Sequence, residues 1–188
     1  MKNALNLKLT RVLRFAMPTP KRFAALDTGF LLSLAVGEEK CETVIDWLSR
    51  NHIYPLVTGT VLQELDDIEQ EDNDPFNRQN AQRVLQNIST WGFLEVPLTP
   101  VENGVAKIIG ANLVARGLIP DECENDGLVI AEAASQGCVI LVTFREGLLQ
   151  APFDALKLML IESDVSGLIV ASPDMITDHI ERAKTTTT

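Results

Sequence analysis

Short apolar runs alternate with segments of helical periodicity along most of the chain. The apolar runs predict strands, and the segments between them place apolar residues three and four positions apart, as in Cys41, Val44, Ile45 and Leu48. Continuous apolar strands separated by helices are typical of a parallel sheet that is covered on both faces. The sequence therefore predicts an α/β fold with three layers, α/β/α, around a central parallel sheet of about five strands. The predicted strands are 24–27, 54–58, 93–98, 139–143 and 168–172, and the predicted helices include 61–68, 84–91, 100–116, 126–136, 153–161 and a last helix from Pro173.

The chain of 188 residues is long enough for one domain with a sizeable core, and no linker or repeat divides it. We place this domain at residues 23–184. Residues 1–22 carry six basic and no acidic side chains, and we expect a flexible basic arm there. An extension upstream of a start at Met17, a nucleic-acid-binding arm and a transit peptide are alternatives for this segment. The threonine run at 185–188 is expected to fray.

Charge and cysteine content narrow the functional classes. The net charge is −10, and residues 23–188 carry 10 basic against 26 acidic side chains, a balance of −16 that repels nucleic acid at long range. An RNA substrate would need metal ions, the basic arm or a local basic patch. Three widely spaced cysteines form no disulfide framework or paired zinc motif, which predicts a reducing, cytoplasmic location. No apolar run approaches the ~18 residues that cross a bilayer.

Three acidic residues fall where a parallel α/β sheet binds its ligands, beyond the carboxyl ends of the strands. Asp27 ends the first predicted strand, Glu64 lies on the helix after the second, and Asp126 begins the helix before the fourth. At ~100° per residue, Glu64 projects with the core-facing stripe of its helix, and Asp126 does so as well, while Glu132 projects away. A buried carboxylate costs several kcal/mol unless it is paired, protonated or metal-bound. Their convergence predicts a cation site.

Each acid alone has a purely structural alternative. Asp27 is also suited to an Asx turn or to the N-cap of a helix beginning near Gly29, and Asp126 to the N-cap of its own helix. Glu64 can reach water if it lies at the rim. The matched topological positions of the three favour the cation site.

Four segments, in order, resemble a PIN domain. They are ALDTGFLLSLA, LVTGTVLQEL, ENDGLVIAEAASQGCVILVT and LIVASPDMITDHI, which together span about residues 24–182. The insertion ELDDIEQEDNDPFNRQNAQRVL is similar to the long helical arm that some PIN domains carry after the second strand. The resemblance implies that Asp27, Glu64 and Asp126 are metal ligands or catalytic residues and that Thr143 hydrogen-bonds a metal-bound water or a carboxylate. A packed Thr at the end of a strand is the alternative for Thr143.

The resemblance implies a Mg²⁺- or Mn²⁺-dependent endoribonuclease, as a toxin with an antitoxin partner or as an RNA-processing enzyme. Its substrate would be single-stranded or structured RNA, and a homodimer is expected by the same resemblance. Mg²⁺ prefers oxygen ligands and is often held by one or two carboxylates and a substrate phosphate. A catalytically inactive PIN-like module that binds RNA or protein is the second hypothesis.

The sequence departs from the PIN pattern after the fourth strand. PIN nucleases usually place a further Asp two residues beyond the Thr, but this chain has Arg145, followed by Glu146 and by Gly147 where another acid is often found. Arg145 can point inward, pair with Asp27 and Asp126 and occupy the place of the metal. It can instead clamp a phosphate while Glu146 supplies the missing charge, or lie on the surface. We expect weaker metal binding than in a site with four acids.

Other enzyme classes fit the sequence less well. A haloacid-dehalogenase-like site would have an acid two residues after Asp27, where Gly29 stands. No glycine-rich turn of a nucleotide-binding Rossmann fold follows a strand. The two histidines, His52 and His179, lie in no recognisable motif for Ser or Cys nucleophilic catalysis.

Overall fold

The computed structural model describes residues 21–120 and 124–186. Its strands are β1 (Arg22–Leu26), β2 (Ile53–Val57), β3 (Leu94–Glu95), β4 (Cys138–Val142) and β5 (Ile169–Ala171). Its helices are α1 (Thr28–Ala35), α2 (Glu39–Arg50), α3 (Gly59–Glu71), α4 (Pro75–Asn87), α5 (Pro100–Ala115), α6 (Glu124–Ser135), α7 (Glu146–Leu149), α8 (Phe153–Glu162) and α9 (Pro173–Thr186). None of the described helices is long and apolar enough to cross a membrane.

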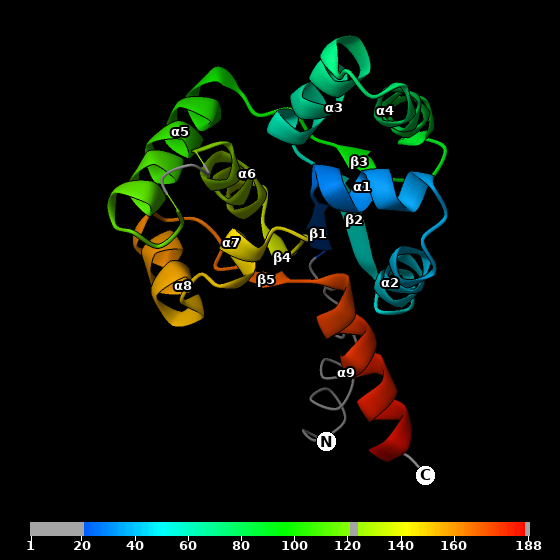
Figure 1. Cartoon of the computed structure of the whole chain (residues 1–188). Coiled ribbons are helices and arrows are strands. Elements are labelled where there is room, and N and C mark those ends of the chain that lie inside the picture. Colours follow the sequence, from blue (N-terminus) through cyan, green and yellow to red (C-terminus); the bar gives the residue numbers. More distant parts are fainter. Residues whose placement is uncertain (1–20, 121–123, 187–188) are drawn as a thin grey trace, which may run out of the picture.

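The strands form one parallel sheet in the order β3-β2-β1-β4-β5, which confirms the predicted three-layer α/β/α fold. From β1 the chain moves to β2 and β3 in one direction across the sheet, and it then returns to β4 and β5 on the other side of β1. Because connections between parallel strands are right-handed, the helices that connect the strands lie on opposite faces of the sheet for the two directions. Accordingly, α1 to α4 lie on one side of the sheet and α5 to α8 on the other (Figure 1). The succession reverses between β1 and β4, and this switch point is where open α/β sheets bind ligands.

The strands are apolar because both faces of the sheet are covered. Ala24, Ala25 and Leu26 of β1 are fully buried, as are Leu141 and Val142 of β4. At the edge of the sheet the prediction is less accurate, since β3 covers two residues instead of the predicted 93–98. Pro97 lacks an N–H for the ladder, and the edge position leaves only β2 as a partner.

The closest packing between helices joins α5 to α6 and fixes the position of the carboxylate that α6 carries. A Cβ built on Gly110 of α5 would lie 3.0 Å from the backbone of Gly127 and Leu128. A Cβ on Gly127 would lie 2.9 Å from the carbonyl oxygen of Gly110. Glycine at both positions therefore allows the two helix backbones to touch, directly beside Asp126.

The ends of the described chain modify the expected domain limits. β1 begins at Arg22, so the first strand includes the last residue of the predicted basic arm, whereas residues 1–20 lie outside the described residues. α9 continues to Thr186, into the segment that was expected to fray.

Candidate functional site

The first acidic residue, Asp27, lies between β1 and α1 at the switch point of the sheet. Its Oδ1 accepts a hydrogen bond from the backbone N–H of Phe30 at 2.7 Å, so Asp27 is the N-cap of α1, as one of the sequence alternatives proposed. Its Oδ2 accepts a hydrogen bond from the hydroxyl of Thr143, which follows β4. Asp27 is only 4% exposed, and this burial raises the pKa of its carboxyl, against the opposing effects of both hydrogen bonds and of the nearby Arg145 charge.

Thr143 connects the end of β4 to the residue that departs from the PIN pattern. It is fully buried, and its hydroxyl oxygen also accepts a hydrogen bond from the backbone N–H of Arg145 at 2.9 Å. The hydroxyl therefore orients the Asp27 carboxylate and fixes the backbone that carries Arg145.

The second and third acids reach the same edge of the sheet from α3 and α6. Asp126 lies in the first turn of α6, two residues after its start at Glu124, so the N-cap alternative for Asp126 is wrong. Its side chain is 3% exposed, and that of Glu64 is 15% exposed. Both acids face inward, as the helical periodicity predicts. The hydroxyl of Thr28, a buried residue that the sequence reading missed, donates a hydrogen bond to Glu64 Oε2.

Arg145 points inward and joins these carboxylates. Its guanidinium forms an ion pair with Asp126 Oδ1 and a second, at 3.4 Å, with Glu64 Oε2. This is the inward alternative, with Glu64 rather than Asp27 as the second direct partner. Glu146 is exposed at the first position of α7, and none of the hydrogen bonds or ion pairs seen in the described residues links it to the cluster.

One buried oxygen of the three carboxylates remains without a partner. Asp126 Oδ2 is buried and accepts no hydrogen bond. Such an atom usually has an explanation in strain, function or a bound ion or water. It shows that Arg145 compensates the buried carboxylates only in part.

The donor set fits a divalent cation in chemistry, although Arg145 interposes its own charge. Carboxylate and hydroxyl oxygens are the ligands that Mg²⁺ and Mn²⁺ prefer, and Asp126 Oδ2 is free to take one. Within residues 21–120 and 124–186, no three His, Cys, Asp or Glu side chains are close enough to hold one ion in the present arrangement. The Arg145 side chain is 44% exposed, so it reaches the cluster from the solvent side.

Glu132 corrects one sequence expectation. It was predicted to project away from the core, yet it is only 4% exposed. Its Oε2 accepts a hydrogen bond from the backbone N–H of Thr60 at 2.9 Å, near the start of α3, where Thr58 makes no side-chain cap. Glu132 of α6 therefore satisfies the N-terminus of α3 and holds together the two helices that carry Glu64 and Asp126.

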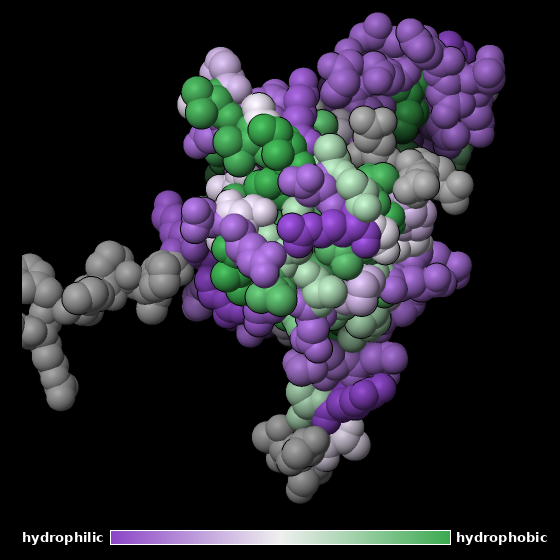
Figure 2. All heavy atoms as spheres, turned by 90° about the vertical axis from the view of Figure 1, so that its left-hand side faces the viewer, coloured by the Kyte–Doolittle hydropathy of each residue, from purple (hydrophilic) through white to green (hydrophobic). Residues whose placement is uncertain are grey.

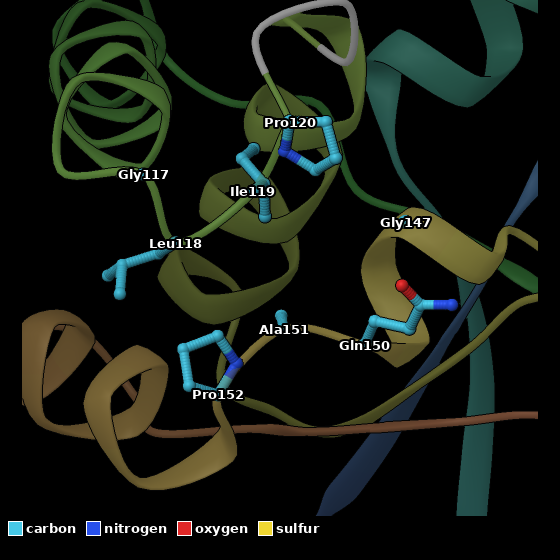
Figure 3. Close-up of a pocket in the computed structure, with 8 residues that line it drawn as sticks. All are labelled: Gly117, Leu118, Ile119, Pro120, Gly147, Gln150, Ala151 and Pro152. Atoms are coloured by element: carbon cyan, nitrogen blue, oxygen red, sulfur yellow. The ribbon is translucent and has the colours of Figure 1, made fainter.

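A pocket of about 420 Å³ lies beside α7 (Figure 3). One wall is formed by residues 117–120, which follow α5, and the other by α7 with the residues that follow it. Ile119 of the first wall packs against Gly127, the neighbour of Asp126, since a Cβ built on Gly127 would lie 2.9 Å from Ile119 Cδ1. Gly147 of the second wall is two residues beyond Arg145. The pocket is lined by Gly117, Leu118, Ile119, Pro120, Gly147, Gln150, Ala151 and Pro152.

Two of the three cysteines are buried thiols. Burial raises the pKa of Cys41 and of Cys138 to about 12, so neither is a reactive thiolate. Cys123 lies outside the described residues.

Comparison with known proteins identifies the architecture. No protein-family model matches the sequence, and no curated protein matches it. Among solved structures, a chain of VapBC2 from Rickettsia felis, bound to a DNA fragment from the promoter, has 16% sequence identity and a TM-score of 0.56, and the match covers 80% of this chain and 98% of that chain. A chain of FitAcB from Neisseria gonorrhoeae has 17% identity and a TM-score of 0.50, and the match covers 80% of this chain and 97% of that chain. A chain of FitAB bound to the IR36 DNA fragment has 16% identity and a TM-score of 0.50, and the match covers 80% of this chain and 94% of that chain. The chain therefore has a PIN-like α/β/α fold.

Proposed function

We propose that the protein is a Mg²⁺- or Mn²⁺-dependent endoribonuclease that hydrolyses RNA phosphodiester bonds at the cluster of Asp27, Glu64 and Asp126. The observation that carries the proposal is the convergence of these carboxylates at the switch point, with Asp126 Oδ2 buried and unpartnered. Asp27 also caps α1, and Asp126 and Glu64 share the Arg145 guanidinium, but neither contact uses Asp126 Oδ2. A cation ligand role explains why all three face inward.

The side chains of the cluster have distinct roles in this proposal. Asp126 and Asp27 hold the ion, and Glu64 completes the shell or orients a water. A bound divalent ion lowers the pKa of a water and neutralises charge that develops on the phosphate. Thr143 holds the Asp27 carboxylate in place through its hydroxyl, and Thr28 does the same for Glu64.

Arg145 competes with the ion and then serves the substrate. Its guanidinium and a metal ion cannot both occupy the space between Asp126 and Glu64. Two unit charges ~4 Å apart interact with an energy of about 4 kcal/mol at an effective dielectric of 20. The competition between Arg145 and the ion therefore weakens metal binding substantially. Once displaced, the guanidinium is free to bind a phosphate oxygen of RNA, for which its planar fork of donors is well suited. This contact also offsets the repulsion between an acidic protein and RNA.

The pocket beside α7 can take part of the RNA next to the scissile phosphate. One wall contains Gly147, two residues beyond Arg145, and Ile119 of the other wall packs against Gly127, the neighbour of Asp126. Its aliphatic and proline walls suit a nucleobase, and the amide of Gln150 offers both a donor and an acceptor.

A second function, a catalytically inactive PIN-like module, is favoured by the ion pair between Arg145 and Asp126. In that case the guanidinium is a permanent replacement for the metal, and the protein acts by binding RNA or a protein. The similar chains come from VapBC2 and FitAB complexes, which supports an antitoxin as a partner for either function.

The two functions are separated by cleavage of single-stranded and structured RNA in Mn²⁺, Mg²⁺ and EDTA. We expect cleavage in Mn²⁺ that is lost in EDTA and lost in Asp27→Asn and Asp126→Asn. The matched control is Asp46→Asn, an exposed acid of α2, which should cleave like the wild type. Absence of cleavage under every metal, or cleavage that both active-site variants retain, contradicts the nuclease proposal.

A further inference from the structure

A cavity of about 600 Å³ lies between α2 and α9, and none of the residues that line it belongs to the carboxylate cluster. An ion pair at 3.4 Å between Lys40 and Asp174 joins the first turns of the two helices. α9 then runs past α2 and away from the other helices (Figure 1). Seen from the side, this half of α9 is a projection with a mostly hydrophilic surface (Figure 2). The cavity is lined by Trp47, Asn51, His179, Ile180, Ala183 and Lys184.

Two aromatic rings form a corner in this cavity. The ring centroids of Trp47 and His179 are 6.4 Å apart and the ring planes are at 83°, which is an edge-to-face contact. Trp47 is half-buried, and His179 is exposed. Because the two planes are nearly perpendicular, a flat ring that enters the corner can stack on one of them while it meets the other at its edge. The corner therefore suits a planar aromatic ligand.

Polar groups around this corner match the remaining parts of a nucleotide. Nδ2 of Asn51 donates a hydrogen bond to the carbonyl oxygen of Trp47 at 2.8 Å, which orients the amide and leaves its Oδ1 as an acceptor. The exocyclic amino group of a nucleobase is a donor for such an oxygen. His179 and Lys184 supply N–H donors, which are suited to the oxygens of a phosphate.

The charge of this cavity is opposite to that of the whole protein. The chain has a net charge of −10, yet none of the described residues that line the cavity is acidic. At about 100° per residue, Asp178 and Glu181 of α9 project to the side of the helix away from the cavity. On α2, the acid next to Trp47 is Asp46, which forms an ion pair at 3.3 Å with Arg50. The cavity therefore favours an anionic ligand.

We infer that this cavity binds a nucleoside phosphate, with the base in the corner of Trp47 and His179 and the phosphate beside Lys184. A bare anion would not use the aromatic corner, and a neutral aromatic compound would not use the basic side chains. A free nucleotide offers this chemistry, and so does a nucleotide of single-stranded RNA, whose unstacked bases bind aromatic side chains. The RNA source rests on the proposed function, whereas the site itself uses none of its carboxylates.

The chain has two tryptophans, which allows a direct test. Trp91→Phe leaves Trp47 as the reporter, and its fluorescence is followed in EDTA during titration with AMP and with a short oligoadenylate. EDTA keeps the measurement free of metal-dependent cleavage. We expect saturable quenching of Trp47 by both probes. Binding of the oligoadenylate that is at least about tenfold tighter identifies RNA as the occupant, and equal affinities identify a free nucleotide.

Variants in this background test the residues of the cavity. His179→Ala should weaken AMP binding about tenfold, the loss expected for one hydrogen bond to a charged group, and Lys184→Ala should weaken it as well. The matched control is Lys157→Ala, which removes a lysine that lies 5.7 Å from the ring centroid of Phe153 on α8 and should leave the affinity unchanged. Ala183→Phe fills the cavity without removing a hydrogen-bonding group, and it should abolish quenching with an unchanged far-UV circular dichroism spectrum.

Adenosine tests the phosphate part of the ligand. It should bind at least about tenfold more weakly than AMP, because it lacks the charged oxygens. Absence of quenching by both AMP and the oligoadenylate overturns the inference. So does an affinity that His179→Ala and Ala183→Phe leave unchanged, or adenosine binding as tight as that of AMP. A protein that binds AMP but cleaves no RNA contradicts the nuclease proposal alone, and one that cleaves RNA without quenching contradicts this inference alone.

Discussion

The guanidinium of Arg145 forms an ion pair with the Asp126 carboxylate, whose side chain is only 3% exposed, and no basic side chain other than Arg145 pairs with Asp126 in the described residues. The same guanidinium lies 3.4 Å from Glu64 Oε2, so one positive charge serves two acids from different helices. It does not satisfy the whole cluster, since Asp126 Oδ2 keeps no partner. One guanidinium thus holds carboxylates from α3 and α6 together, while a buried carboxylate oxygen beside it keeps no partner.

Arg145→Ala should lower the free energy of unfolding in EDTA by about 1–3 kcal/mol. Removing one member of a fully buried ion pair leaves an uncompensated charge and lowers the free energy of unfolding by about 3–5 kcal/mol. The loss is smaller here because the Arg145 side chain is half-exposed. Urea denaturation gives the value. Arg50→Ala, which removes an exposed partner of Asp46 on α2, should change the stability by less than about 0.5 kcal/mol. Equal losses in the two variants contradict the role of Arg145 as the counter-ion.

Asp27→Asn should be at least as stable as the wild type at pH 7 without metal. Burial raises the pKa of Asp27 above its ordinary value of 3.8, so the folded state binds more protons than the unfolded state between the two pKa values. The Asp27 contribution therefore favours folding below pH 3.8 and is lost as the pH rises through the raised pKa. Asparagine keeps an acceptor for Phe30 N–H and removes the charge.

The measurement for Asp27 is urea denaturation in EDTA across pH 4 to 7. The difference in unfolding free energy between Asp27→Asn and the wild type should shift in favour of the variant as the pH rises. A variant that loses stability relative to the wild type with rising pH would show that the ionised Asp27 carboxylate stabilises the fold.

Gly110→Ala should destabilise the protein by about 1–3 kcal/mol, the usual loss from overpacking. The new methyl group would meet backbone atoms of Gly127 and Leu128 at 3.0 Å, so α5 and α6 must move apart. Gly104→Ala is the matched control on the same helix, because no atom lies within 4 Å of its built Cβ. That change should be neutral or stabilising by up to about 1 kcal/mol. Thermal denaturation of both variants decides, and equal melting temperatures contradict the close contact.

Gln150→Ala should raise KM for RNA several-fold with little change in kcat, because Gln150 lines the pocket beside α7 and not the cluster itself. Steady-state cleavage kinetics in Mn²⁺ measure both constants. Gln63→Ala changes a glutamine of α3 that bonds Asp67, and it should leave both constants unchanged. An unchanged KM in Gln150→Ala would remove the pocket from the RNA path.

The end of the apolar strand β1 located Asp27, and the core-facing stripe of α3 located Glu64. Asp126 was predicted to face inward because it projects with apolar residues one and two turns along α6. Sequence periodicity failed for Glu132 because α6 is buried on nearly every side, between the sheet, α5 and α3, and such a helix has no solvated face to predict. It could not choose the direction of Arg145, which depends on side-chain torsions and on partners from α3 and α6. Thr28 gave no signal, since a Thr next to an N-cap is common in any helix.

The domain architecture was predictable for a different reason. Strands such as β1 and β4 are buried on both faces and therefore have continuous apolar sequences. The exposed edge strand β3 cannot be told from a loop by its sequence. Predicted strand boundaries differ from the observed ones by one or two residues at β1, β2, β4 and β5. The order of the strands follows from right-handed crossovers and a single reversal of direction.

Isothermal titration of the metal-free protein with Mn²⁺ tests most directly whether the carboxylates form a cation site that Arg145 occupies in part. We expect weak binding to the wild type, binding at least tenfold tighter to Arg145→Ala, and no binding to Asp126→Asn combined with Arg145→Ala. The affinity should rise with pH as Asp27 loses its proton. Equal affinity in the wild type and Arg145→Ala, or tight binding that survives the loss of Asp126, would contradict the account.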